Sequence, residues 1–273
     1  MKDRPLMSFD WALKFILRQK DNFSILEGFL ADLLEENIKI EELLESESNK
    51  NYSDDRSNRV DLRAKDSKDR EIIIEVQYQD ELDYLERIYY GTSKSVVDNM
   101  QQGYKYDRVK KVISISIVYW QFLEKSYLIK GTVKFDDLIS NIPIVVENSE
   151  KVFADYYFIQ PKWFNDTIKT KFDEWVYLFK NSKIKGDIAA TNIDKVQDKL
   201  DLLAMSREER AAYDRYELDK TIYYGELQAS ENKGIRKGLQ QGIEQGMKQG
   251  KQALIETLRR NGMSEEDILK YTK

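Results

Sequence analysis

The chain has 273 residues, of which 44 are Lys or Arg and 49 are Asp or Glu, so its formal net charge at pH 7 is −5. It contains no His and no Cys, which excludes Cys zinc sites, thiol nucleophiles, Ser-His-Asp triads and His-dependent metalloproteases. A metal would therefore have oxygen ligands, as Mg²⁺, Mn²⁺ and Ca²⁺ prefer.

No apolar run approaches the 18 residues of a membrane-spanning helix, and the first ten residues lack the apolar stretch of a signal peptide. We therefore expect a cytoplasmic protein with no membrane partner. The net charge of −5 does not by itself indicate nucleic-acid binding, although a local basic groove can exist on a chain of negative net charge.

Apolar residues recur at helical spacing through residues 1–37, with a break near residues 19–22. Ser8 or Asp10 is suited to cap the first helix. A strand-like segment over residues 38–45 then leads into a polar loop, residues 46–57.

Two alternating segments, residues 59–64 and 71–78, flank a polar turn and predict a β-hairpin. If the hairpin closes symmetrically at Lys68, Asp61 stands directly opposite Glu75, with the two Cβ atoms about 5 Å apart. Gln77 projects from the same face as Glu75 because side chains alternate along a strand.

Two carboxylates that close together repel each other, so one is expected to be protonated unless a cation neutralises them. A divalent cation held by these oxygens would polarise a phosphoryl oxygen and activate water. The alternative is that Asp61 and Glu75 are solvated residues on the open face of a half-buried hairpin, where charged side chains are ordinary.

The rest of the chain predicts a helix, more strands and then helices. The predicted helix covers residues 81–101, and residues 111–120 predict a strand buried on both faces. Further strands are expected over 127–135 and 156–159, and helices over 164–181, 192–204 and 207–224. This order indicates a mixed α/β domain over 1–160, a helical region over 161–230 and a distinct tail over 231–273.

The tail is marked by glycines four residues apart, with an apolar stripe beside them. The glycines are Gly234, Gly238, Gly242, Gly246 and Gly250, and the apolar residues are Ile235, Leu239, Ile243 and Met247. Residues 231–260 carry seven basic and three acidic side chains. We expect this helix to mediate homo-oligomerisation or DNA contact; the alternative is a solvated, fraying tail. Ser264 is expected to cap a short last helix.

An ordered series of segments resembles one family along nearly the whole chain. These segments are residues 8–14 (SFDWALK), 44–49 (LESESN), 58–62 (NRVDL), 74–77 (IEVQ) and 89–94 (YYGTSK), the Gly-rich tail and 262–268 (GMSEEDI). They resemble the recombination-promoting nuclease and transposase family of the PD-(D/E)XK nuclease superfamily. The resemblance implies a restriction-endonuclease-like mixed sheet flanked by helices, with a helical C-terminal region.

The resemblance also implies the site. Asp61 and Glu75 match the acids that bind Mg²⁺, or Mn²⁺ in its place, and the Val76 carbonyl would be a further ligand. Gln77 stands where the superfamily usually has lysine, and members of this branch also tend to have glutamine at that position. Asp10 is a candidate for an additional acid from the first helix, although an N-cap role explains it equally well.

The function implied is a metal-dependent DNA endonuclease that hydrolyses phosphodiesters in recombination or transposition. The alternative is a catalytically weak or inactive DNA-binding or interaction module on the same fold, which the glutamine at the lysine position favours.

Basic side chains around the hairpin are candidates for the charge that Gln77 lacks and for contacts with DNA phosphates. Arg59 and Arg63 lie on the face of Asp61, and either would supply the missing charge. Arg87, Lys94 and Lys105 are candidate phosphate contacts; a solvated helix face explains these three equally well.

Overall fold

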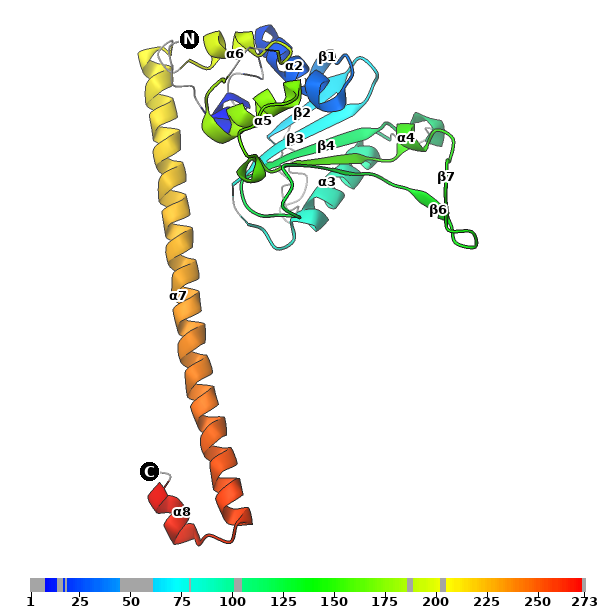
Figure 1. The fold of residues 1–273 in the computed structure, drawn as a ribbon. Coiled ribbons are helices and arrows are strands. Elements are labelled where there is room, and N and C mark those ends of the chain that lie inside the picture. Colours follow the sequence, from blue (N-terminus) through cyan, green and yellow to red (C-terminus); the bar gives the residue numbers. More distant parts are fainter. Residues whose placement is uncertain are drawn as a thin grey trace. The chain divides into compact units, whose positions relative to one another are not determined.

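The computed structural model describes residues 8–13, 17, 19–44, 61–78, 80–100, 105–185, 189–201 and 205–271. Contacts divide the chain into two compact units, Met1–Ser206 and Arg207–Lys273. The first unit contains the sheet and most helices, and the second contains two helices (Figure 1). The expected division into 1–160, 161–230 and 231–273 stays a prediction, because contacts do not measure which parts fold independently.

A six-stranded mixed sheet forms the centre of the first unit, which confirms the predicted fold class. The strand order is β1-β2-β3-β4-β8-β5. Strands β3, β4 and β8 are parallel to one another, whereas β1, β2 and β5 pair antiparallel with their neighbours. The strands are β1 (Ile40–Leu44), β2 (Leu62–Asp66), β3 (Glu71–Gln77), β4 (Val112–Val118), β5 (Leu128–Gly131) and β8 (Asp155–Ile159).

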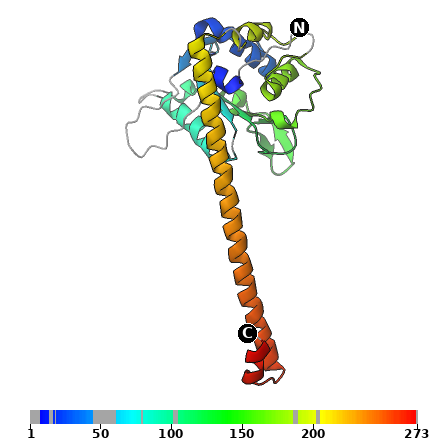
Figure 2. The same cartoon turned by 90° about the vertical axis from the view of Figure 1, so that its left-hand side faces the viewer.

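Helices cover both faces of this sheet. Figures 1 and 2 show α2 (Phe23–Leu34) and α5 (Lys171–Asn181) on one side and α3 (Tyr84–Asp98) on the other. Tyr84 and Ile88 of α3 pack with Val118 and Phe158 of the sheet. Because both faces are covered, every residue of β4 is buried, as predicted.

Helix α2 is held closely against α5 and the segment that follows it. The Asp32 carboxylate accepts hydrogen bonds from Trp175 Nε1 at 2.9 Å, Thr191 N at 2.7 Å and Thr191 Oγ1 at 2.7 Å. At Gly28 the approach is so close that a Cβ atom would lie 2.0 Å from the Thr191 carbonyl oxygen. A glycine is therefore required at this point of the helix.

Helix boundaries differ from the sequence predictions where local capping decides them. Helix α5 begins at Lys171 rather than at residue 164, because Thr170 and Asp173 form a capping box; a short 3₁₀ turn, η4 (Pro161–Trp163), precedes it. Near the N-terminus, Ser8 occupies the N-cap position of α1 (Phe9–Trp11), and Asp10 lies within that helix. Further short elements of the unit are η2 (Lys20–Asn22), η3 (Tyr106–Arg108) and α6 (Asp194–Lys199).

Helix α3 packs on the sheet through a side that is not its most apolar one. The buried residues are Tyr84, Ile88, Thr92 and Ser95, whereas Leu82, Leu85, Tyr89 and Val97 are exposed. The packing side therefore carries a tyrosine and two hydroxyl side chains. A hydrophobicity count undervalues these residues because they are partly polar.

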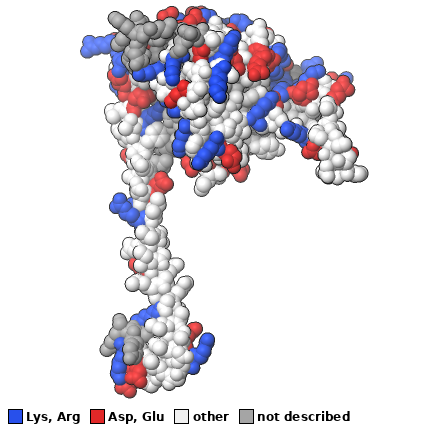
Figure 3. All heavy atoms as spheres, in the orientation of Figure 1, with Lys and Arg blue, Asp and Glu red and all other residues white. Residues whose placement is uncertain are grey.

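The strand predicted over residues 127–135 was wrong in its second half. Strand β5 ends at Gly131, and a separate hairpin of β6 (Phe135–Asp137) and β7 (Ile142–Ile144) follows, then α4 (Ser149–Val152). Leu138 and Ile139 in the hairpin turn are almost fully exposed, and the tip is uncharged (Figure 3).

The second unit is a 54-residue helix, α7 (Arg207–Arg260), followed by α8 (Glu265–Tyr271). The helix predicted to end at residue 224 thus continues through the Gly-periodic segment. The predicted cap of α8 is confirmed, since Asp267 N donates to Ser264 Oγ at 3.3 Å. In the described parts of the chain, no helix combines the length and apolarity needed to cross a membrane.

Candidate active site

The β2–β3 hairpin has the predicted register. Leu62 pairs with Ile74 and Ala64 with Ile72, and the same register continued by one residue brings Asp61 opposite Glu75. Two carboxylates therefore meet at the open end of the hairpin, on the face of the sheet that α3 covers.

Glu75 is buried rather than solvated. Its side chain is 9% exposed, and burial raises the pKa of Glu75 to about 7; the Arg87 guanidinium opposes this rise, and the charges of Asp61 and Glu81 add to it. The expected protonation of one carboxyl is thus located at Glu75. Its leading cause is loss of hydration rather than repulsion by Asp61, because α3 covers this part of β3.

The backbone of Val76 faces Asp61. The Asp61 Oδ2 atom accepts a hydrogen bond from Val76 N at 2.7 Å. The N–H and C=O groups of one strand residue point to the same edge of the strand, so the Val76 carbonyl points toward the same side. The carbonyl of the next residue points to the other edge of β3, because these groups alternate in direction along a strand. Accordingly, Gln77 O accepts a hydrogen bond from Tyr119 N, which follows β4, at 3.0 Å.

Helix α3 and the residues before it bring three further groups to Glu75. Arg87 Nη2 lies 3.1 Å from Glu75 Oε2, and Arg87 Nε lies 3.1 Å from Glu81 Oε2. The Arg87 guanidinium carbon lies 4.9 Å from the centre of the Tyr84 ring. Burial and the charge of Glu75 both raise the pKa of the Tyr84 hydroxyl, which therefore stays protonated.

Three buried polar atoms of this cluster make no hydrogen bond within the described residues: Glu75 Oε2, Tyr84 Oη and Arg87 Nε. The ion pairs of Arg87 are close, but their atoms are not aligned for hydrogen bonds. Buried polar atoms normally make hydrogen bonds, and a cluster of such atoms that make none indicates a place for water, an ion or a ligand.

The residues present fit a hard divalent cation. Asp61 and Glu75 offer carboxylate oxygens, and the Val76 carbonyl points to the same side. Among the described residues no group of three acids suitable for a metal occurs. Mg²⁺ is satisfied by one or two carboxylates, because it retains several of its waters.

The other predicted site residues are not all brought here. Asp10 lies in α1, with its side chain outside the described part, and Arg59 lies outside the described residues altogether. Arg63 lies on the same face of the sheet as Asp61, but it is engaged with Glu71, because its Nε donates to Glu71 Oε1 at 2.6 Å. Lys94 is half-buried on α3, and Lys105 is exposed before η3.

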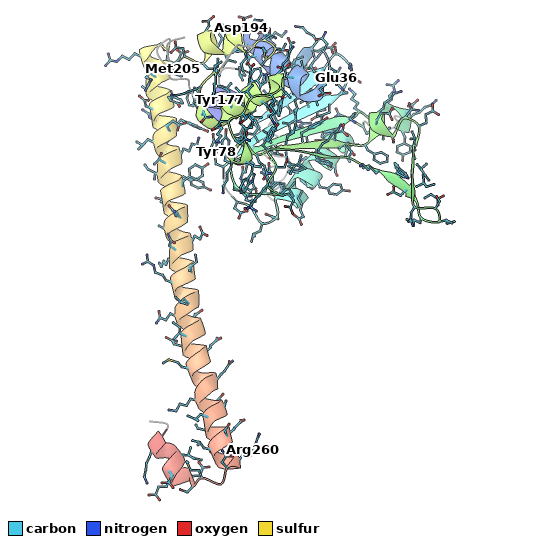
Figure 4. The ribbon with its side chains drawn as sticks, in the orientation of Figure 1. Glu36, Tyr78, Tyr177, Asp194, Met205 and Arg260 are labelled. Carbon is cyan, nitrogen blue, oxygen red and sulfur yellow. The ribbon has the colours of Figure 1, made fainter. Side chains whose placement is uncertain are left out.

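The turn end of the hairpin, away from the carboxylates, is rich in ion pairs. Figure 4 labels Tyr78, which follows Gln77 at the carboxylate end, and Glu36, which binds the turn at the other end through Lys68 and Arg70. A pocket of ≈ 680 Å³ lies at the turn end and is rich in lysine and arginine. Its Lys110 and Lys111 are paired with Asp69 and Asp155 at 2.9 Å, so much of its positive charge is already neutralised.

Sequence reasoning missed Tyr84 as a member of the site and treated Arg87 only as a phosphate contact. Both residues lie on one side of α3 because they are three positions apart. That spacing was visible in the sequence, but the face on which α3 packs was not.

Comparison with known proteins gives the family of the chain. No curated protein and no solved structure matches the chain. The model of one family, described as PD-(D/E)XK nuclease family transposase, matches residues 7–224. The match includes the whole sheet and the carboxylate hairpin. With its restriction-endonuclease-like fold and most of its length matched, the chain belongs to the PD-(D/E)XK nuclease family transposases.

Proposed function

We propose that this chain is a metal-dependent endonuclease that hydrolyses phosphodiester bonds of DNA during recombination or transposition. The observation that carries the proposal is the pairing of Asp61 with a buried Glu75 whose Oε2 atom lacks a hydrogen bond among the described residues. Mg²⁺, with Mn²⁺ as its substitute, is the cation that such an oxygen site favours.

In this proposal Asp61, Glu75 and the Val76 carbonyl would hold the cation, which when bound would stabilise negative charge on a phosphoryl oxygen and lower the pKa of water. Gln77 ends β3 on the face of Glu75 and orients water or a phosphate oxygen by hydrogen bonding. Hydrolysis forms a bond between a water oxygen and phosphorus, breaks the bond from phosphorus to a sugar oxygen, and leaves a water proton on that sugar oxygen.

The alternative function is a DNA-binding or interaction module with little catalysis. Two observations favour it: Gln77 carries no charge, and Arg87 already pairs with Glu75 at 3.1 Å. Nicking of supercoiled plasmid with Mg²⁺ or Mn²⁺ separates the two functions. We expect the wild type to nick and Asp61→Ala to be inactive; equal cutting by both would reject the nuclease proposal and favour the binding module.

Gln77 has its own test under single-turnover conditions. Loss of one well-placed hydrogen-bond donor costs roughly 10²–10³-fold in rate, so Gln77→Ala is expected nearly to abolish nicking while metal binding remains. Gln77→Lys is expected to retain or increase the activity. If Gln77→Ala cuts like the wild type while Asp61→Ala does not, the metal site stands and the role of Gln77 does not.

Metal binding is tested without activity by thermal melting with and without Mg²⁺. Asp61→Asn and Glu75→Gln are expected to leave the metal-free protein as stable as the wild type or more stable, because Asp61→Asn removes charge repulsion and Glu75→Gln removes a charge that burial disfavours. Both variants are expected to lose the rise in Tm that Mg²⁺ causes in the wild type. If Mg²⁺ raises the Tm of Asp61→Asn as much as that of the wild type, the metal site is rejected.

The C-terminal unit extends the proposal to partners. The apolar side chains beside the glycines of α7, Ile235, Leu239, Ile243 and Met247, are all exposed, and a Cβ atom built on each of these glycines meets nothing within 4 Å. We propose that a second copy of the chain packs on this stripe, which glycines allow by close backbone approach. DNA is the proposed substrate, and the cytoplasm the proposed location.

A further inference from the structure

The two carboxylates of the proposed site provide no fixed positive charge beside the phosphate, so another group must supply it. Gln77 is neutral. A positive group aimed at the charge that develops on a phosphoryl oxygen is among the largest contributions to such reactions. The candidates are therefore the cations that lie near Asp61 and Glu75.

Arg63 is held elsewhere. Its Nε donates to Glu71 Oε1 at 2.6 Å, and Asn99 Nδ2 donates to the other oxygen of the same carboxylate at 2.7 Å. Glu71 is itself only 2% exposed. Withdrawing Arg63 would leave a buried carboxylate short of its ion pair, which is costly.

Arg87 is held much less firmly. It approaches Glu75 and Glu81 at 3.1 Å without aligned hydrogen bonds, and its Nε atom makes none within the described residues. The Tyr84 ring supports the guanidinium at 4.9 Å. The Arg87 side chain is 25% exposed where Glu75 is 9% exposed, so Arg87 extends from the buried carboxylate toward solvent.

We propose that Arg87 provides the positive charge that Gln77 lacks. In the metal-free protein Arg87 is the counter-ion of Glu75, and in the DNA complex its guanidinium binds the oxygens of the scissile phosphate. A planar guanidinium suits this task because it donates two parallel hydrogen bonds to a phosphate. This inference rests on the proposed nuclease function, and it assigns a substrate-contacting residue on α3 instead of on β3.

The test is a set of variants in which the positive charge is removed from position 87 and then introduced at position 77, each measured by single-turnover plasmid nicking with Mg²⁺. Arg87→Met keeps the length of the side chain and removes its charge, and we expect a rate roughly 10²–10³-fold lower. Adding Gln77→Lys to Arg87→Met restores a positive charge from β3, and the rate is expected to recover about tenfold or more. Arg108→Met, an exposed arginine in η3, is the matched control and is expected to cut like the wild type.

Melting with Mg²⁺ provides a readout that does not depend on cutting. Arg87→Met is expected to keep the Mg²⁺-induced rise in Tm or to increase it, because Glu75 loses a competing cation. Loss of that rise, or failure of Gln77→Lys to restore cutting, would assign Arg87 a structural role and overturn the inference.

The inference and the proposed function fail in different ways. If Asp61→Ala is inactive while Arg87→Met cuts like the wild type, the nuclease stands and the role of Arg87 is rejected. If the wild type does not cut, or Asp61→Ala cuts equally well, both the proposed function and the inference are rejected.

Discussion

The surroundings of Glu75 differ from those of an ordinary, solvated strand carboxylate. Glu75 lies beneath α3, opposite Asp61 and 3.1 Å from Arg87 Nη2. Burial raises its pKa to about 7, so the metal-free protein near neutral pH contains a mixture of charged and neutral Glu75. A bound cation would add to the effect of Arg87 and shift this mixture toward the charged carboxylate.

The raised pKa of Glu75 makes stability depend on pH. Because the folded state holds this proton more tightly than the unfolded state, the contribution is fully present below about pH 4.5 and is lost as pH rises through about 7. The shift corresponds to about 3 kcal/mol of unfolding free energy by pH 8. Glu75→Gln does not titrate, so we expect it to match the wild type near pH 5 and to exceed its stability at pH 8.

Urea unfolding in EDTA at several pH values measures this difference. Glu86→Gln, an exposed position on α3, is the control and should follow the wild type throughout. A constant difference between Glu75→Gln and wild type from pH 5 to 8 would contradict a raised pKa for Glu75.

Among the elements, two helices use glycine for different reasons. In α2, Gly28 permits contact with the backbone at Thr191, where a Cβ atom would lie 2.0 Å from a carbonyl oxygen. In α7, Gly225, which lies before the glycine stripe, has nothing within 4 Å of the corresponding position. The same residue type is thus a packing requirement in one helix and a cost to helix stability in the other.

These two glycines predict opposite effects of the same substitution. Gly28→Ala is expected to destabilise the first unit by about 2–3 kcal/mol, because the backbone at Thr191 must shift. Gly225→Ala is expected to stabilise α7 by about 1 kcal/mol through helix propensity, because Gly225 lies before the glycine stripe. Thermal melts and helix content by circular dichroism measure both; a neutral Gly28→Ala would show that α2 and the segment at Thr191 are not held as closely as described.

For the whole molecule, the second unit carries the proposed self-association. Residues 231–260 have seven basic and three acidic side chains, so they also add positive charge for DNA. Deleting residues 231–273 leaves the sheet and its carboxylates unchanged. We expect a folded monomer that binds DNA more weakly and with a smaller dependence on salt.

A single substitution in the full chain tests the association more sharply. Gly242→Leu places a bulky side chain on the glycine stripe and is expected to lower the oligomeric state in sedimentation experiments, because it blocks close backbone approach. Gly225→Leu is the control, since it lies on the same helix before the stripe and also has open space around it. An unchanged oligomeric state for Gly242→Leu and for the deletion would reject the association.

The β2–β3 hairpin and the position of Asp61 opposite Glu75 could be predicted from the amino-acid sequence alone. Both follow from local rules, since alternation sets the faces and a symmetric turn sets the register. The sequence also predicted the buried strand β4 and the cap of α8. The absence of histidine and cysteine limited any metal to oxygen ligands before the fold was known.

The side on which α3 packs against the sheet could not be predicted from the sequence and is known only from the fold. Leu85 and Tyr89 of α3 are exposed, whereas Tyr84 packs on the sheet and Arg87 reaches Glu75. This packing buries Glu75, shifts its pKa and places a guanidinium beside it. Burial and long-range ion pairing depend on residues brought together by the whole fold, and for this reason local periodicity did not reveal them.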